Sequence, residues 1–229
     1  MRPVTHTIPK ALIPVNGRPF AFHQLELLKK HGITRATFSI GFKGEQIQAA
    51  VQDGRAFGLQ VDYVDEGPEL VGTGGAVRLA YDRGVLDDVF FVLYGDSYLP
   101  IDYQSPWKLF AQTQAPALMT VFRNLGRFDR SNARFADGKV FYDKQAAAAG
   151  QGGFDFIDYG LSILRRETVS AIAARTKSDL AELFHGLSLK NQLIGYEVTE
   201  RFYEAGSPEG LLALEKFVAS EKSTSIPGN

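Results

Sequence analysis

Up to Asp96 the chain alternates between strand-like and helix-like segments over short links, and this alternation restricts the fold more than any other feature. It ends in Val89–Tyr94 (VFFVLY), a continuous apolar run that predicts a strand buried on both faces. Such alternation is typical of a parallel α/β sheet. The predicted segments are a helix over 20–31, a strand over 33–40, a helix over 44–51, a strand over 59–64, a helix over 76–83 and the strand over 89–94.

Beyond Asp96 the segments are more varied, and we see no internal repeat and no linker. Ser207 and Pro208 open the last helix, because serine caps helices well and proline suits the first helical position. The predicted segments are a helix over 105–113, a strand over 117–123, a hairpin over 133–142, a mobile loop over 146–153, a strand over 155–164, helices over 167–175 and 179–190, an extended stretch over 196–203 and the last helix. We therefore expect one domain over 1–229, with 223–229 frayed.

Composition excludes several classes of protein. The net charge of −1 is too low for a nucleic-acid binder that relies on phosphate contacts, and no apolar run is long enough to span a membrane. The absence of cysteine removes disulfides and thiolate metal sites and fits a cytoplasmic protein. The four histidines are scattered, so they do not predict a zinc site.

The first twenty residues carry three prolines within twelve positions, which disfavours both helix and strand. We expect a rigid, extended loop that presents Lys10 between Pro9 and a short apolar run. The prolines and polar residues also interrupt the apolar core that a signal peptide needs. Taken alone, Lys10 and Lys144 are ordinary surface lysines.

Three further features of the sequence could carry chemistry. Gly72–Gly75 lies between an extended segment and a helix, where glycine lets a backbone approach a flat or phosphorylated ligand. A simple tight turn explains the same residues. Asp96 follows a strand, at the sheet edge where α/β proteins bind ligands, and could hold a divalent cation or only cap a turn. Glu204 could be a second metal ligand or a charge that complements a helix dipole.

Taken together, these segments resemble the sugar-1-phosphate nucleotidyltransferases. Residues 3–5 (P-x-T) and Ile8–Val15 (IPKALIPV) look like the end of the family signature, G-x-G-T-R-x-x-P-x-T and P-K-x-[LM]-x-P-V. The looser matches are Gly72–Ala76 to its nucleobase-facing loop, Gly95-Asp96 to its metal-binding G-D, Tyr142–Lys144 to its E-E-K-P, Asp158–Gly160 to its sugar-contacting D-x-G and Phe202–Pro208 to its W-x-D-x-G-T.

The resemblance implies a Rossmann-like three-layer α/β/α fold with a mixed, mostly parallel sheet. Residues 1–100 would form the nucleotide-binding half and 101–222 the sugar-phosphate-binding half. The implied reaction is attack of a sugar 1-phosphate on the α-phosphate of a nucleoside triphosphate, with pyrophosphate leaving. The implied site residues are Lys10 and Lys144 for catalysis; Gly72, Thr73, Gly74 and Gly75 for the nucleotide; Asn132, Tyr159 and Gly160 for the sugar; and Asp96 and Glu204 for Mg²⁺.

The chain departs from the family pattern in three places. Glu204 stands where the family mostly has aspartate, and Lys144 lacks its flanking glutamate and proline. Met1 follows directly after the position of the family's arginine, so we expect the first strand and the G-x-G-T-R loop to be missing. That loss would impair activity and leave a gap or a rearranged sheet beside the strand over 89–94.

Two alternatives to an enzyme stay open: a non-catalytic nucleotide-sugar-binding or regulatory protein on the same scaffold, and an unrelated α/β domain. The sequence does not identify the base, the sugar or the oligomeric state, and a homo-oligomer is compatible with it.

Overall fold

The computed structural model describes residues 8–224 and divides into two compact units. Unit 1 comprises the described residues up to 65 together with 95–100 and those from 202 onward; unit 2 comprises 66–94 and 101–201. The chain therefore crosses between units several times, and 66–94 groups with the second half of the sequence instead of the first. The prediction of a single domain over 1–229 stays a prediction.

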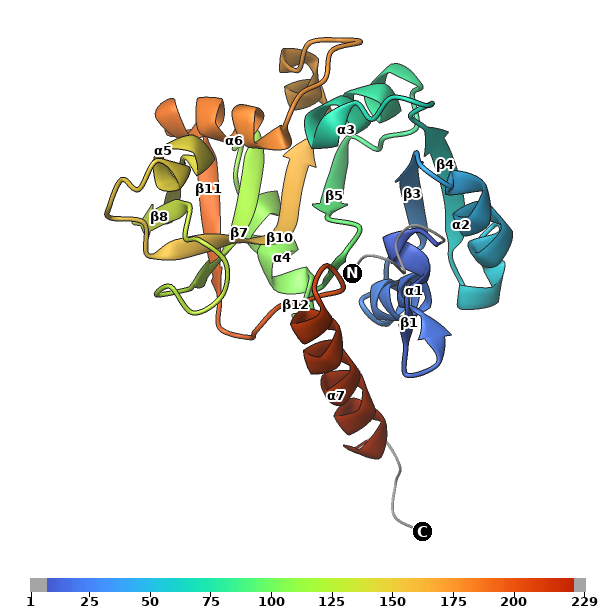
Figure 1. Ribbon diagram of the computed structural model, residues 1–229. Coiled ribbons are helices and arrows are strands. Elements are labelled where there is room, and N and C mark those ends of the chain that lie inside the picture. Colours follow the sequence, from blue (N-terminus) through green and yellow to red (C-terminus); the bar gives the residue numbers. More distant parts are fainter. Residues whose placement is uncertain (1–7, 225–229) are drawn as a thin grey trace. The chain divides into compact units, whose positions relative to one another are not determined.

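Unit 2 is built on a six-stranded sheet (Figure 1). Its strands, in spatial order, are β5 (Val89–Leu93), β10 (Phe156–Arg165), β7 (Ala117–Arg123), β11 (Leu193–Val198), β9 (Lys139–Tyr142) and β8 (Ala133–Ala136). β7 and β11 run parallel, whereas β10 pairs antiparallel with both β5 and β7. The predicted α/β class is confirmed. The sheet is mixed as expected, but it is not mostly parallel, because β10 inserts in the opposite direction between β5 and β7.

Helices cover both faces of this sheet, as Figure 1 shows for unit 2. Successive strand residues point to opposite faces, so Met119 and Leu118 on β7 belong to different core clusters. The Met119 cluster lies against α3 (Gly72–Asp82) and α6 (Leu180–Leu189), and the Leu118 cluster against Phe110 of α4 (Gln104–Ala111). This is the three-layer arrangement that the resemblance implies.

Strand β5 lies at the edge of the sheet. It pairs with β10, and no other strand in the described part of the chain pairs with its second edge. Its five apolar residues are all half-buried, so the prediction of a strand buried on both faces is wrong. The reason is the open edge of β5; the missing strand that we expected beside it stays a prediction.

Unit 1 packs α1 (Phe20–Lys30) between two clusters. Ala21 and Leu25, one turn apart, contact the cluster formed with the parallel pair β3 (Arg35–Ile40) and β4 (Gln60–Asp65), α2 (Gly44–Val51) and the 3₁₀ turn η3 (Arg55–Phe57). Phe20 and Leu27 contact a second cluster, which includes Leu214 of α7 (Pro208–Thr224). Both faces of α1 are therefore apolar and buried.

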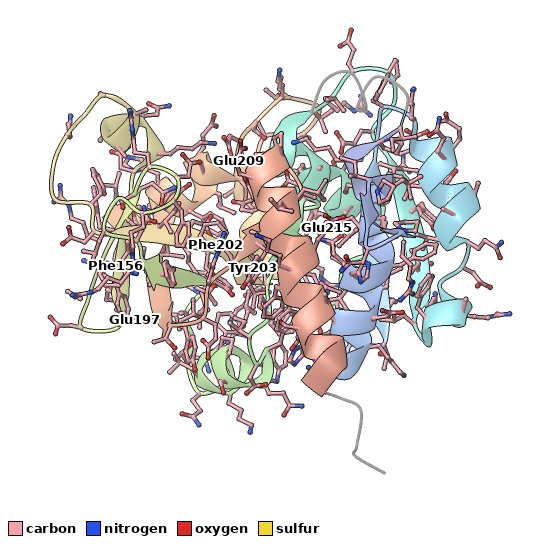
Figure 2. The ribbon with its side chains drawn as sticks, turned by 60° about the horizontal axis from the view of Figure 1, so that its bottom comes forward. Phe156, Glu197, Phe202, Tyr203, Glu209 and Glu215 are labelled. Carbon is pink, nitrogen blue, oxygen red and sulfur yellow. The ribbon has the colours of Figure 1, made fainter. Side chains whose placement is uncertain are left out.

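Two short ladders complete unit 1: β1 (Pro14–Val15) with β2 (Arg18–Pro19), and β6 (Ser97–Tyr98) with β12 (Tyr203–Glu204). Tyr203 lies beside α7 in Figure 2. Its ring stacks on that of Phe217, with 4.5 Å between the ring centroids. Asn16, in the turn of the first ladder, donates from Nδ2 to the carbonyl of Glu215 on α7 at 2.8 Å. These contacts fix α7 within unit 1.

Most predicted elements are confirmed to within a few residues. Helix α3 starts at Gly72, four residues earlier than predicted, so Gly72–Gly75 forms its first turn. The predicted mobile loop over 146–153 begins inside α5 (Lys144–Ala148), and the helix predicted over 167–175 is only the 3₁₀ helix η4 (Arg166–Ala171).

The amino-terminal stretch is less extended than we expected. Lys10 opens the 3₁₀ turn η2 (Lys10–Leu12), and Asn16-Gly17 forms a hairpin turn with φ of 47° and 77°, the positive angles that Asn-Gly supplies. The part of the prediction that concerns residues 1–7, and the frayed tail after Thr224, lie outside the described residues. No helix among the described residues combines the length and apolar character needed to cross a bilayer.

Candidate functional site

The β6–β12 ladder brings Asp96 and Glu204 together in unit 1. Ser97 lies opposite Glu204 in the ladder, and the amide of Ala205 donates to the carbonyl of Asp96 at 2.9 Å. Two carboxylates more than a hundred residues apart in sequence thus share one short piece of β structure. Both were predicted metal ligands, and the structure places them side by side.

Lys10 contacts one of these carboxylates. Its Nζ lies 3.1 Å from Oδ2 of Asp96, and both side chains are partly exposed (51% and 36%). Buried Pro9 and Ile13 anchor the 3₁₀ turn on either side of the lysine, while Lys10 itself points outward. The turn therefore fixes the backbone of Lys10 and leaves its ammonium accessible.

Glu204 is held at the amino terminus of α7. Its Oε1 accepts a hydrogen bond from the Ser207 hydroxyl at 2.9 Å, and the Ser207 oxygen accepts from the amide of Gly210 at 3.0 Å, as a helix cap does. A Cβ on Gly210 would lie 2.7 Å from the carbonyl oxygen of Glu204 and 2.8 Å from its Cγ. Gly210 therefore supplies the room that this longer acidic side chain occupies.

One oxygen of each carboxylate lies near Gly206. A Cβ added to Gly206 would lie 3.4 Å from Oε2 of Glu204 and 3.5 Å from Oδ2 of Asp96, so both oxygens border the same open point. Oxygen ligands are those that Mg²⁺ prefers, and it commonly takes one or two carboxylates with substrate phosphates and water. The described residues contain no cluster of three or more metal-binding side chains, so the protein would supply only part of a coordination shell.

In unit 2, Lys144 occupies the first position of α5. Asp143 caps this short helix by accepting from the amides of Gln145 and Ala146. The ammonium of Lys144 contacts Oδ2 of Asp179 at 2.7 Å. Asp179 in turn caps α6 by accepting from the amide of Ala181. The predicted catalytic lysine is therefore held by the aspartate that caps α6.

The glycine-rich turn lies against the segment before α6. The carbonyl of Ser178 accepts from the amides of Gly74 and Gly75 at 3.0 and 3.4 Å, so these amides are not free to bind a phosphate. A Cβ on Gly72 would lie only 2.4 Å from that same carbonyl oxygen. Thr73 donates its hydroxyl to Oδ1 of Asp179 at 3.0 Å. The inner side of the turn thus serves packing, and a nucleotide-binding role for its outer side stays a prediction.

A second polar cluster surrounds Asn132 and Asp158. Oδ1 of Asn132 accepts from the amide of Asp158 at 2.9 Å, and Oδ1 of Asp158 accepts from the amide of Gly160, where β10 is irregular. Gly160 has a φ of 102°, which a side chain would strain. Oδ2 of Asp158 accepts from the Tyr94 hydroxyl at 2.9 Å. The side-chain N–H donors of Asn132 have no partner among the described residues.

Burial raises the pKa of Asp158 to about 6, against the opposing effects of the Gly160 and Tyr94 hydrogen bonds and the positive charge of Lys144. Burial, followed by the charge of Asp158, raises the pKa of Tyr94 well above its usual value. Burial alone would also raise the pKa of Asp179. The hydrogen bonds from Lys144, Ala181 and Thr73 outweigh the effect of burial, so the pKa of Asp179 lies below its ordinary value.

The predicted sugar-binding residues lie in two different environments. Asn132 and Gly160 lie in the polar cluster, whereas the Tyr159 side chain is buried and packs near Phe122. A hollow of about 410 Å³ lies between the loops at 126–131 and 150–154, but none of the predicted site residues lines it. Sequence reasoning missed the roles of Asp179 and Gly210, because no motif marks these residues. It included Gly206 only as part of the match to W-x-D-x-G-T.

Comparison with known proteins identifies the family. The model of the family described as "Nucleotidyl transferase" matches residues 1–127, more than half of the chain. A UTP–glucose-1-phosphate uridylyltransferase of Synechocystis sp. is 30% identical over 192 residues, covering 79% of this chain and 50% of the relative. An N-acetylmuramate alpha-1-phosphate uridylyltransferase of Neisseria meningitidis is 27% identical, covering 90% of this chain and 88% of the relative. The chain thus spans about half the length of the first of these relatives.

The solved structures agree on the fold. A putative glucose-1-phosphate thymidylyltransferase from Bacillus anthracis, in complex with a sucrose, superposes with a TM-score of 0.81 over all of this chain and 92% of the other. The two sequences are 17% identical, so this likeness concerns the fold alone.

Proposed function

Because this chain belongs to the nucleotidyl transferase family, we propose that it transfers a nucleoside monophosphate from a nucleoside triphosphate to a sugar 1-phosphate, releasing pyrophosphate. The two relatives described above are uridylyltransferases named for sugar 1-phosphates, which supports this class of substrate. The observation that carries the proposal is the meeting of Lys10 with Asp96 beside Glu204.

In unit 1, Lys10 would neutralise charge on the triphosphate. Its ammonium has three N–H donors, so it can keep its contact with Asp96 and still donate to a phosphate oxygen. Asp96 and Glu204 would hold Mg²⁺, on which we propose that the activity depends. When bound, Mg²⁺ supplies charge neutralisation for the reacting phosphates. The partly exposed positions of Lys10 and Asp96 leave both groups open to a ligand from solvent.

In unit 2, Lys144 would bind the phosphate of the sugar and the free amide N–H groups of Asn132 would donate to a sugar oxygen. Gly160 allows the irregular backbone that places Asp158 and Asn132 together. The nucleotide-binding role of Gly72–Gly75 would use the outer side of the turn. Phosphoryl transfer of this kind depends on positioning and charge neutralisation, which these fixed polar groups can supply.

One observation favours a second candidate, a non-catalytic protein that binds nucleotide sugars. The amides of Gly74 and Gly75 already donate to Ser178, so the amino terminus of α3 offers no free phosphate cradle there. A binder of this class would take up a nucleotide sugar without releasing pyrophosphate from a triphosphate.

Pyrophosphate release distinguishes the two candidates. We would incubate the protein at high concentration with Mg²⁺ and each pairing of four nucleoside triphosphates with glucose, mannose and N-acetylmuramate 1-phosphates. We expect release that requires both substrates and Mg²⁺ and that falls at least about 100-fold in Asp96→Asn. Asp62→Asn, a partly exposed change in the same unit, is the matched control and should retain activity. Binding of nucleotide sugars without release from any pairing would favour the second candidate.

A further inference from the structure

Asp179 connects three parts of unit 2 through a single carboxylate. Oδ1 accepts from the amide of Ala181 and from the Thr73 hydroxyl, both at 3.0 Å. Oδ2 accepts from the ammonium of Lys144 at 2.7 Å. The Thr73 oxygen also accepts from the amide of Leu180 at 2.9 Å, which closes a ring of hydrogen bonds at the start of α6. One oxygen of Asp179 therefore belongs to the scaffold, and the other faces Lys144.

The scaffold behind Asp179 is tightly fixed. The preceding residue, Ser178, donates its amide to the carbonyl of Val71 and accepts from the amides that open α3. Gly72 and Gly74 pack so closely on this segment that a Cβ on either would approach its atoms to within 2.4 and 2.8 Å. The backbone of Asp179 consequently has little freedom to move relative to the glycine-rich turn.

Lys144 is not fixed in this way by its own surroundings. It begins a helix of five residues, and its side chain is 57% exposed. A long exposed lysine side chain adopts many rotamers, and ordering it on a ligand costs conformational entropy. The short contact with Asp179 restricts those rotamers before a ligand arrives. One of the three N–H donors of the ammonium meets Asp179, and two remain for a phosphate.

We propose that Asp179 is a positioning residue, which holds the ammonium of Lys144 in place for the phosphate of the sugar substrate and ties it to the glycine-rich turn. This inference rests on the proposed function, since it takes Lys144 as the group that meets the sugar phosphate. Asp179 itself does not contact the substrate. Its contribution is to fix the site of the positive charge, so its loss should weaken binding of the sugar phosphate more than binding of the nucleotide.

The substitution Asp179→Asn distinguishes the roles of the two carboxylate oxygens. The amide oxygen of asparagine can still accept from Ala181 and Thr73, and asparagine is a good helix cap. The amide nitrogen that replaces Oδ2 cannot accept from Lys144. Glu182→Gln, an exposed change on the same helix that removes the same charge, is the matched control.

Two measurements on the full chain test the proposal. The first is the reactivity of Lys144 toward acetic anhydride at pH 8, quantified by mass spectrometry relative to Lys139. We expect Lys144 to react at least about threefold faster in Asp179→Asn than in the wild type or Glu182→Gln. The second is steady-state kinetics. We expect the KM for the sugar 1-phosphate to rise about tenfold in Asp179→Asn, while the KM for the triphosphate changes less than twofold.

Three results would overturn the inference: unchanged reactivity of Lys144, an unchanged KM for the sugar 1-phosphate, or equal rises in both KM values, which would indicate a merely structural role. If the wild type turns over no substrate pair, the proposed function has failed. The KM measurement is then replaced by a protection experiment, in which added glucose 1-phosphate should slow the reaction of Lys144 with acetic anhydride. Protection in the wild type that is lost in Asp179→Asn would still support the inference, and absence of protection in the wild type would refute it.

Discussion

The half-buried carboxylate of Asp158 makes the stability of unit 2 depend on pH in a direction that the structure fixes. Its pKa is about 6 in the folded protein, against an ordinary value of 3.8. Below pH 3.8 the group is protonated in both the folded and the unfolded chain, so it does not lower the free energy of unfolding. Between pH 3.8 and about 6 the unfolded chain releases the proton and the folded chain keeps it, so the free energy of unfolding falls as the pH rises. Above pH 6 this loss is complete.

The substitution Asp158→Asn removes this cost. The difference between the two pKa values corresponds to about 3 kcal/mol, because one pKa unit is about 1.4 kcal/mol. The side-chain oxygen of the asparagine can still accept from the backbone amide of Gly160, and its side-chain N–H can donate to the Tyr94 hydroxyl. Both positions therefore keep a hydrogen bond, although the direction of the one with Tyr94 is reversed. We therefore expect the variant to match the wild type at pH 4 and to be more stable by up to about 3 kcal/mol at pH 8.

Urea unfolding followed by tryptophan fluorescence measures this difference. Trp107 is the only tryptophan of the sequence and lies on α4, so its signal follows unit 2, which also contains Asp158. Asp155→Asn, an exposed change three residues earlier, is the control and should shift the free energy by less than about 0.5 kcal/mol at either pH. A gain in stability of Asp158→Asn that is the same at pH 4 and pH 8, or a loss of stability at pH 8, would contradict this prediction.

Two further substitutions test unit 1. Lys10→Met should change the free energy of unfolding by less than about 1 kcal/mol, because the ion pair with Asp96 is partly exposed. The same substitution should lower the transfer rate at least about 100-fold. Lys108→Met, on α4, is the control for the loss of a surface charge. Gly210→Ala should destabilise the protein by about 1–3 kcal/mol and weaken Mn²⁺ binding, because the new methyl group would meet the carbonyl of Glu204 at 2.7 Å. Gly186→Ala on α6 meets no atom within 4 Å and should instead stabilise by about 0.5–1 kcal/mol; equal effects of the two glycine substitutions would contradict the role given to Gly210.

Much of the fold could be predicted because local patterns agree with the final structure. Strand β7 has the predicted bounds of Ala117–Arg123, and α7 begins where Ser207 and Pro208 indicate a cap. Patterns of this kind depend only on the side chains within a segment. The direction of β10 does not, because its position between β5 and β7 is decided by the sheet as a whole.

The candidate site could be predicted in part for the same reason. The sequence motifs suggested Lys10, Asp96 and Glu204 in unit 1. The β6–β12 ladder brings Asp96 and Glu204 together, and Lys10 contacts Asp96. Asp179 carried no comparable signal, since a helix-capping aspartate looks the same whether or not a lysine meets its second oxygen. The start of α3 at Gly72 was also hidden, because glycine disfavours helices unless a neighbouring backbone needs the space, as Ser178 does here.

Transfer of label from an α-³²P-labelled nucleoside triphosphate to a sugar 1-phosphate would show directly whether the protein makes a nucleotide sugar. We would use micromolar protein with Mg²⁺, separate the products by chromatography, and compare the wild type with Asp96→Asn. We expect a labelled nucleotide sugar for at least one pairing, formed only when both substrates are present and not formed by the variant. Absence of the product for every pairing, or equal formation by the wild type and Asp96→Asn, would contradict this expectation.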